Sequence, residues 1–103
     1  RLTRLDAGNA RRREIAAAYD AALAGGPFAP PARREGAEHV FHQYVLRAPG
    51  DRAAVQARLR DEGVGTGIHY PVPVHLQPAY LDRVPLGPAG CGETERAAGE
   101  VFS

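Results

Sequence analysis

The stretch from Gly63 to Tyr80, GVGTGIHYPVPVHLQPAY, restricts the fold of this chain more than any other segment. Its first five residues include three glycines, which allow backbone conformations closed to other residues. Pro71 and Pro73 fix their own φ and push the residues before them towards extended geometry. We therefore predict a short strand over Val64–Tyr70 that continues into a stiff extended loop. Such a loop can hold binding groups, or it can be a rigid connector whose rings pack on a neighbour.

A β-α-β unit over residues 39–70 is predicted to contain this strand. The segment His39–Arg47, HVFHQYVLR, is rich in Val, Phe and Tyr, which favours a first strand. Asp51 is well placed to cap a helix over Arg52–Glu62, and Gly63 would end that helix. The two strands could be adjacent, or they could be separated by a strand that lies outside this chain.

Residues 1–26 predict a long amphipathic helix, closed by Gly25-Gly26 and Pro27. Along one stripe, residues recur at alternating spacings of three and four, and the middle of the stripe is polar. These residues are Leu2, Leu5, Asn9, Arg12, Ala16, Tyr19 and Leu23.

The remaining segments are predicted to be loop, apart from the C-terminal one. Residues 27–38 and 71–92 are rich in Pro, Gly and charge. Residues 93–103 are predicted to begin a final helix with Val101 and Phe102 on its buried side. Neither end carries a capping signal, so we expect residues 1–103 to be a partial, single domain of a larger protein.

Composition and charge exclude several classes of partner. The net charge is only +1, and the three consecutive arginines at 11–13 would point in different directions on a helix, so we expect no nucleic-acid surface. No apolar run is long enough to cross a membrane. The single cysteine, Cys91, cannot form an internal disulfide and fits a reducing, cytoplasmic compartment. Many apolar residues are alanine, which predicts a small core.

No complete catalytic or metal-binding group of residues is visible. His39 and His42 have the spacing of a ligand pair, but on a strand an offset of three places them on opposite faces. Cys91 has no neighbour in the sequence that would activate it as a nucleophile. All thirteen basic residues are arginine, so the chain contains no lysine. We therefore expect no metal site and no catalytic residue in this chain.

The segments HVFHQYVLR and RLRDEGVGTGIHYPVPVHLQPAY closely resemble the DegT/DnrJ/StrS-type sugar aminotransferases, which use pyridoxal phosphate. The resemblance covers nearly the whole chain. It implies an α/β fold, namely the C-terminal small domain of the aspartate aminotransferase (type I) fold. That domain has a long inter-domain helix at its N-terminus, a β-α-β unit and a C-terminal helix. The family holds its cofactor on a lysine of the large domain, so this chain alone should be inactive.

The resemblance also implies a function for the whole protein and a site in this chain. The parent enzyme would transfer an amino group from an amino acid donor to a keto-sugar, usually nucleotide-linked, in sugar or antibiotic biosynthesis, and would be a homodimer. His69, Tyr70 and His75 would bind the substrate and project from one mouth of the domain. Relatives that use cyclitols, or that dehydrate their substrate, remain open. A second hypothesis is a non-catalytic α/β module that binds a small molecule or a partner chain.

Overall fold

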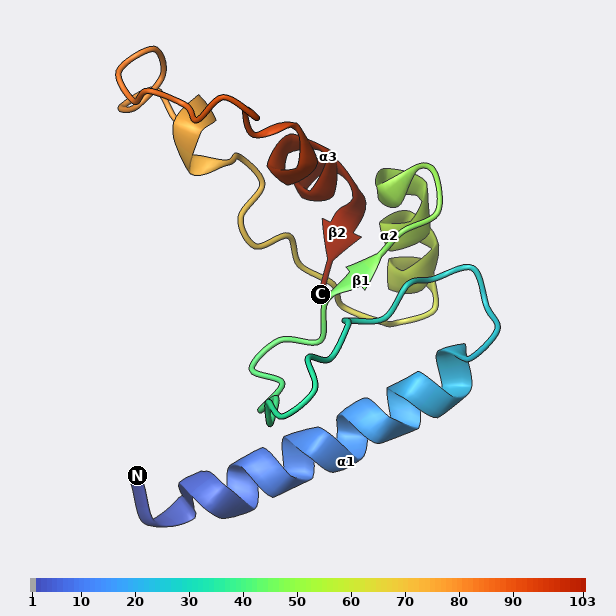
Figure 1. Cartoon of the computed structure of the whole chain (residues 1–103). Coiled ribbons are helices and arrows are strands. Elements are labelled where there is room, and N and C mark those ends of the chain that lie inside the picture. The colour runs from blue at the N-terminus through green and yellow to red at the C-terminus, as the bar shows by residue number, and fades with distance from the viewer. Residues whose placement is uncertain (1) are drawn as a thin grey trace.

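The computed structural model describes residues 2–103 as a long helix beside a small α/β unit (Figure 1). The α/β unit places two short strands between two helices, and a loop at its far end extends away from the sheet. The radius of gyration is 16.4 Å, against about 13 Å for a compact chain of this length. The elements are η1 (Leu2–Arg4), α1 (Leu5–Leu23), β1 (Leu46–Arg47), α2 (Arg52–Asp61), η2 (Val74–Leu76), α3 (Gly92–Glu100) and β2 (Val101–Phe102).

Helix α1 forms where the sequence predicts it and is attached to the rest of the chain by polar contacts. Only Ala16 on this helix is buried. The Tyr44 hydroxyl donates a hydrogen bond of 2.7 Å to Asp20 Oδ1, and Arg33 forms an ion pair with Asp20 Oδ2. The rings of Tyr19 and Tyr44 lie 5.1 Å apart. The C-terminal half of α1 therefore faces a loop that carries charged and aromatic side chains, whereas the polar middle of the predicted stripe, Asn9 and Arg12, forms a bond within the helix at its surface.

The sheet is narrow, and the end of the chain lies in its middle. Strand β1 pairs with β2 in antiparallel register, Leu46 opposite Phe102 and Arg47 opposite Val101. On the other side of β2, Ser103 donates to the Gly67 carbonyl at 2.8 Å and accepts the Gly67 N–H. Two residues that exchange both backbone bonds form an antiparallel pair. Residues 46–47 and the backbone at Gly67 are therefore parallel, as in a β-α-β unit, with β2 between them.

This arrangement corrects the predicted final helix. Helix α3 ends at Glu100, and Val101 and Phe102 form a strand instead of the buried side of the helix. A β-branched and an aromatic residue favour a pleated surface, and here they have β1 as a partner. The strand that separates the two arms of the β-α-β unit therefore belongs to this chain, although we expected it, if present, to lie outside.

The two predicted strands are much shorter than expected. Of His39–Arg47, only the last two residues form a strand. Phe41 has a φ of 47°, and its N–H donates to His39 Nδ1 at 2.9 Å, so this part of the backbone turns and cannot join a ladder. Of Val64–Tyr70, only Gly67 pairs with the sheet, through its two backbone hydrogen bonds with Ser103.

Helix α2 begins and ends as predicted. Asp51 Oδ1 accepts the backbone N–H groups of Ala53 and Ala54 at 2.9 and 3.3 Å, which is the N-cap arrangement. At the other end Gly63 has a φ of 81°, a left-handed conformation that favours glycine. This helix fixes the direction in which the chain enters the segment after Gly63.

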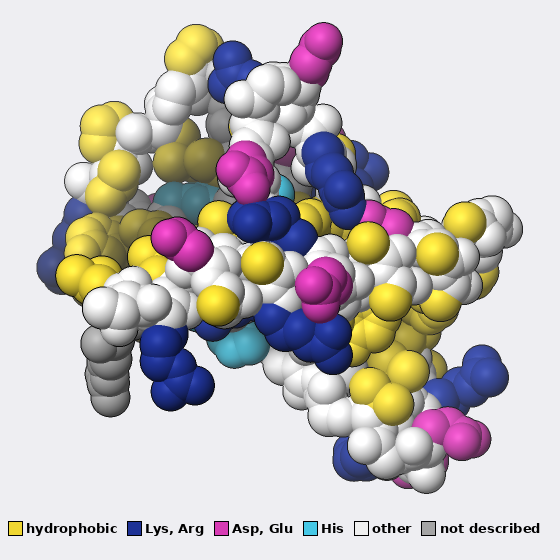
Figure 2. Space-filling model, turned by 90° about the horizontal axis from the view of Figure 1, so that it is seen from below, with side chains coloured by type: hydrophobic (Ala, Val, Ile, Leu, Met, Phe, Trp, Pro, Cys, Tyr) yellow, Lys and Arg dark blue, Asp and Glu magenta, His cyan; other side chains and the backbone are white. Residues whose placement is uncertain are grey.

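The core is small, as the composition predicts. The buried hydrophobic residues among the described ones are Ala16, Phe41, Ala48 and Phe102. Figure 2, which views the molecule from the side of α1, shows many hydrophobic side chains at the surface between charged ones. A chain that leaves so much apolar surface in water gains little free energy from burial.

Candidate functional site

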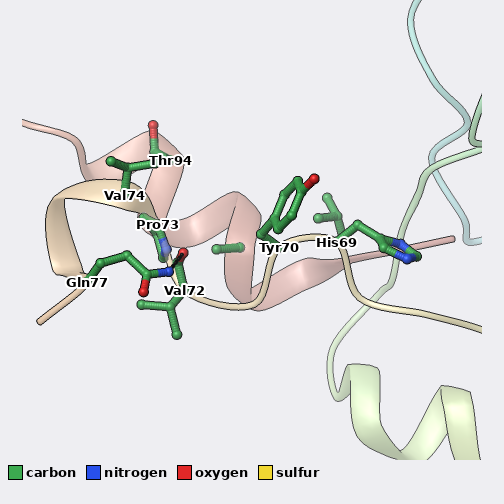
Figure 3. A pocket seen from close by; sticks show the side chains of 9 residues that line it. His69, Tyr70, Val72, Pro73, Val74, Gln77 and Thr94 are labelled. Atoms are coloured by element: carbon green, nitrogen blue, oxygen red, sulfur yellow. Dashed lines mark hydrogen bonds between the residues drawn. The ribbon is translucent and has the colours of Figure 1, made fainter. Parts of the chain in front are cut away.

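A shallow depression of about 470 Å³ lies between the loop that follows Gly67 and one face of α3 (Figure 3). Its floor is mostly apolar, and its polar side chains come from both elements. The lining residues are His69, Tyr70, Val72, Pro73, Val74, Gln77, Thr94, Ala98 and Val101.

The loop side of the depression is held by its prolines and by short internal hydrogen bonds. Pro71 and Pro73 fix φ, so few backbone conformations remain available between them. The Gln77 side-chain N–H donates to the Val72 carbonyl at 3.0 Å, and the Leu76 N–H donates to the Pro73 carbonyl at 3.0 Å. The sequence prediction of a stiff loop agrees with these contacts.

His69 lies at the sheet end of the depression. Its Nδ1 is 3.0 Å from Ser103 Oγ, so the ring is anchored to the residue that pairs with Gly67. A Cβ atom added at Gly67 would lie 2.7 Å from His69 Cε1. The ring therefore packs directly on the glycine backbone, and position 67 has no room for a side chain unless the ring moves.

Tyr70 is the most exposed aromatic residue at this site, with 85% of its surface accessible. Its hydroxyl has no hydrogen-bond partner within residues 2–103. In Figure 3 the phenol ring rises from the loop and the His69 ring points away from it. The hydroxyl is therefore free to donate to, or accept from, a bound molecule.

His75 lies outside the depression. Its Nε2 is 3.0 Å from Glu95 Oε1 on α3, and only 12% of its side chain is exposed. His69 and Tyr70 thus both line the depression, whereas His75, which we predicted to project from the same mouth, turns towards the neighbouring helix. His39 and His42 do not line the depression: His39 contacts Phe41, and His42 lines a separate apolar hollow beside α1.

Sequence reasoning did not single out Gln77 and Thr94, which also line the depression. Thr94 and Ala98 are four residues apart on α3, the spacing of one helical face, and Val101 begins the strand that follows. That spacing could have indicated the α3 side of the site. No comparable pattern points to Gln77, whose role depends on its bond to the Val72 carbonyl.

The described residues do not supply the anchor that pyridoxal phosphate needs. A Schiff base requires a side-chain amine, and the sequence has no lysine. Within residues 2–103 no cluster of three or more His, Cys, Asp or Glu side chains has the arrangement of a metal site. None of the described helices combines the length and apolar character needed to span a membrane.

Comparisons with known proteins give a consistent result. A family model described as the DegT/DnrJ/EryC1/StrS aminotransferase family matches residues 1–103. The erythromycin biosynthesis sensory transduction protein EryC1 of Saccharopolyspora erythraea is 42% identical over 104 residues, which cover 100% of this chain and 28% of that protein. The dTDP-3-amino-3,4,6-trideoxy-alpha-D-glucose transaminase of Streptomyces venezuelae is 40% identical over 86 residues, covering 82% of this chain and 22% of that protein.

Solved structures show the same similarity. DesV of S. venezuelae, in complex with a ketimine intermediate, superposes with a TM-score of 0.85 at 33% identity, covering 99% of this chain and 27% of DesV. A DegT DnrJ EryC1 StrS aminotransferase from Brucella abortus gives a TM-score of 0.89 at 28% identity, covering 99% and 26%. These neighbours confirm the expected α/β fold class, and the chain spans about a quarter of their length.

Both the sequence match over all 103 residues and the close superposition lead to one assignment. The chain belongs to the DegT/DnrJ/EryC1/StrS aminotransferase family.

Proposed function

We propose that this chain is the C-terminal small domain of a pyridoxal-phosphate-dependent aminotransferase. The complete enzyme moves an amino group from an amino acid donor to a keto-sugar, usually nucleotide-linked, in sugar or antibiotic biosynthesis. The observation that carries this proposal is the family match over residues 1–103. The names of relatives as dTDP-amino-sugar transaminases support the class of substrate.

The chemistry of the cofactor is assigned to the part of the enzyme outside this chain. Pyridoxal phosphate, when bound, acts as an electron sink for the carbon that exchanges the amino group. The lysine that carries it must come from the large domain, because this chain has none. The residues described here can bind and orient the substrate and exclude water from one side of the site.

Tyr70 and His69 are proposed to contact the keto-sugar directly. The Tyr70 hydroxyl is exposed and unpaired within residues 2–103, so it can form a hydrogen bond to a sugar hydroxyl or a diphosphate oxygen without breaking another. His69 lines the same depression, with its ring turned away from Tyr70 (Figure 3) and its Nδ1 held by Ser103. His75, which faces Glu95, is proposed to serve the same substrate site through the loop on which it lies.

The test is a comparison of the two half-reactions in the complete enzyme. Replacing Tyr70→Phe or His69→Asn should slow turnover of the keto-sugar and leave the half-reaction with the amino donor nearly unchanged. Loss of one hydrogen bond to the substrate corresponds to about 0.5–1.5 kcal/mol. Tyr80→Phe is the matched control, because Tyr80 is half exposed in the same stretch but does not line the depression.

Single-turnover kinetics of each half-reaction would decide between the outcomes. Equal losses in both half-reactions, or no loss in either, would show that the loop is structural. A complete protein with no lysine-bearing large domain and no transaminase activity would favour a non-catalytic binding module.

The complete enzyme is further proposed to be a cytoplasmic homodimer that requires its large domain as a partner. Cys91 is free, which is compatible with a reducing compartment. Sedimentation equilibrium of the complete enzyme at two concentrations would test the dimer, and cell fractionation would test the compartment.

A further inference from the structure

We propose that Glu95 is a positioning residue for the keto-sugar site, acting through His75 on the loop that carries Tyr70. This inference rests on the proposed function of the site. It assigns His75 to holding the loop instead of to contact with the substrate.

The contact between Glu95 and His75 is the only hydrogen bond among residues 2–103 that joins the segment between Tyr70 and Gly90 to another element. Every other hydrogen bond of that segment is internal to it. Because an ionised carboxylate only accepts, His75 Nε2 carries the hydrogen and donates to Glu95 Oε1 at 3.0 Å. The imidazole is largely buried, which restricts the position of the ring, whereas 49% of the Glu95 side chain remains exposed to water.

Two anchors therefore determine where Tyr70 lies. On one side, His69 is bonded to Ser103 at the end of the sheet. On the other side, His75 is bonded to α3, and Gln77 ties the same part of the loop to the Val72 carbonyl. Pro71 and Pro73 limit the backbone motion between these anchors. Release of the second anchor would leave Tyr70 attached through His69 alone.

Helix α3 also contains a matched control. Glu93 lies on the same helix, is exposed, and pairs with Arg96 one turn away at 2.5 Å. Glu93→Ala therefore removes the same charge from the same helix without touching the loop. Glu95→Gln keeps an oxygen acceptor for His75 at the same position, whereas Glu95→Ala removes it. The glutamine variant should therefore retain most of the loop positioning that the alanine variant loses.

The first measurement does not require turnover. In the complete protein without substrate, amide hydrogen exchange of the peptide over residues 69–77 should be faster in Glu95→Ala than in the unmodified protein, Glu93→Ala or Glu95→Gln. Unchanged exchange in Glu95→Ala would overturn the proposal, because it would show that His75 does not depend on Glu95 to hold the loop.

The second measurement uses steady-state kinetics with the keto-sugar and the amino acid donor varied separately. Glu95→Ala should raise KM for the keto-sugar about three- to tenfold, the equivalent of one hydrogen bond, with kcat and the donor KM nearly unchanged. In a Tyr70→Phe background the same replacement should have a clearly smaller effect, because the group it positions has been removed.

The positioning role would be overturned if Glu95→Ala raised KM for the keto-sugar equally with Tyr70 present and with Tyr70→Phe. It would also be overturned if Glu93→Ala raised that KM as much as Glu95→Ala does. Failure of the proposed function would be distinguishable, since the unmodified complete protein would then not aminate keto-sugars at all. In that case faster exchange in Glu95→Ala would still support the contact between α3 and the loop.

Discussion

Replacement of Tyr44 by Phe tests whether polar contacts hold α1 against the rest of the chain. The change removes the 2.7 Å hydrogen bond to Asp20 and leaves the ring beside Tyr19. A hydrogen bond to a charged acceptor contributes roughly 1.5–3 kcal/mol, and the lower end applies here because a third of the Asp20 side chain is exposed and Arg33 remains as its partner. We therefore expect a loss of about 1–2 kcal/mol, or roughly 5–10 °C in Tm.

Urea unfolding followed by circular dichroism measures this loss, with sucrose added to every sample because the stability of the chain is expected to be low. Tyr19→Phe is the control, since the Tyr19 hydroxyl has no hydrogen-bond partner among the described residues. A Tyr44→Phe variant as stable as the Tyr19→Phe variant would refute the argument and show that α1 is held by ring contacts alone.

The same contact makes a prediction at alkaline pH. Burial, followed by the hydrogen bond to the Asp20 carboxylate, raises the pKa of Tyr44 to about 12. Since the folded state holds the proton more tightly than the unfolded state, the stabilisation is complete below about pH 10 and is lost as the pH rises towards 12. Tyr44→Phe should remove this part of the decline, which urea midpoints measured at pH 9 and pH 11 would show.

Three further predictions concern the chain on its own. Because it has no lysine, borohydride treatment with pyridoxal phosphate should attach no cofactor to any side chain, as mass spectrometry of peptides would show. The apolar hollow of about 530 Å³ beside α1 and the exposed leucines and valines should make the chain associate, so its sedimentation should depend on concentration; a monomer at all concentrations would contradict this. Asp51→Ala should lower the free energy of unfolding by about 1 kcal/mol through loss of the α2 cap, whereas Asp61→Ala, at the opposite end, should cost much less.

The helices could be predicted from the sequence because their signals are local. Asp51 and Gly63 bracket α2, and Gly25-Gly26 followed by Pro27 marks the end of α1. These signals act through bonds and dihedral angles within a few residues, so they do not depend on the rest of the fold.

The sheet could not be predicted in the same way. Val101 and Phe102 follow a helix without a break, and only the distant partner Leu46–Arg47 makes them a strand. Likewise, the composition of His39–Arg47 favours a strand, but the bond from the Phe41 N–H to His39 turns the backbone before the ladder begins. Both cases depend on contacts between segments far apart in the sequence or on side-chain geometry.

The candidate site was partly visible in the sequence. The proline pattern around Tyr70 correctly indicated a stiff exposed loop beside His69. The pairing of His75 with Glu95 could not be read in advance, because it depends on how α3 packs against η2. The substrate-binding roles of His69, Tyr70 and His75 remain predictions.

The place of Val101–Ser103 in the middle of the sheet has a consequence for the order in which the chain assembles. During synthesis, β1 and the segment around Gly67 leave the ribosome before Val101–Ser103; until then β1 has only its bridge to Ala29, and Gly67 lacks its pairing partner Ser103. Each pairing then closes a large loop, and the entropy lost on closure is offset only when the strand contacts have formed. The helices can form early and quickly, whereas the sheet is a late, high-contact-order event. Until the sheet forms, β1 and the segment around Gly67 each keep unpaired backbone N–H and C=O groups that can pair with strands of other nascent chains.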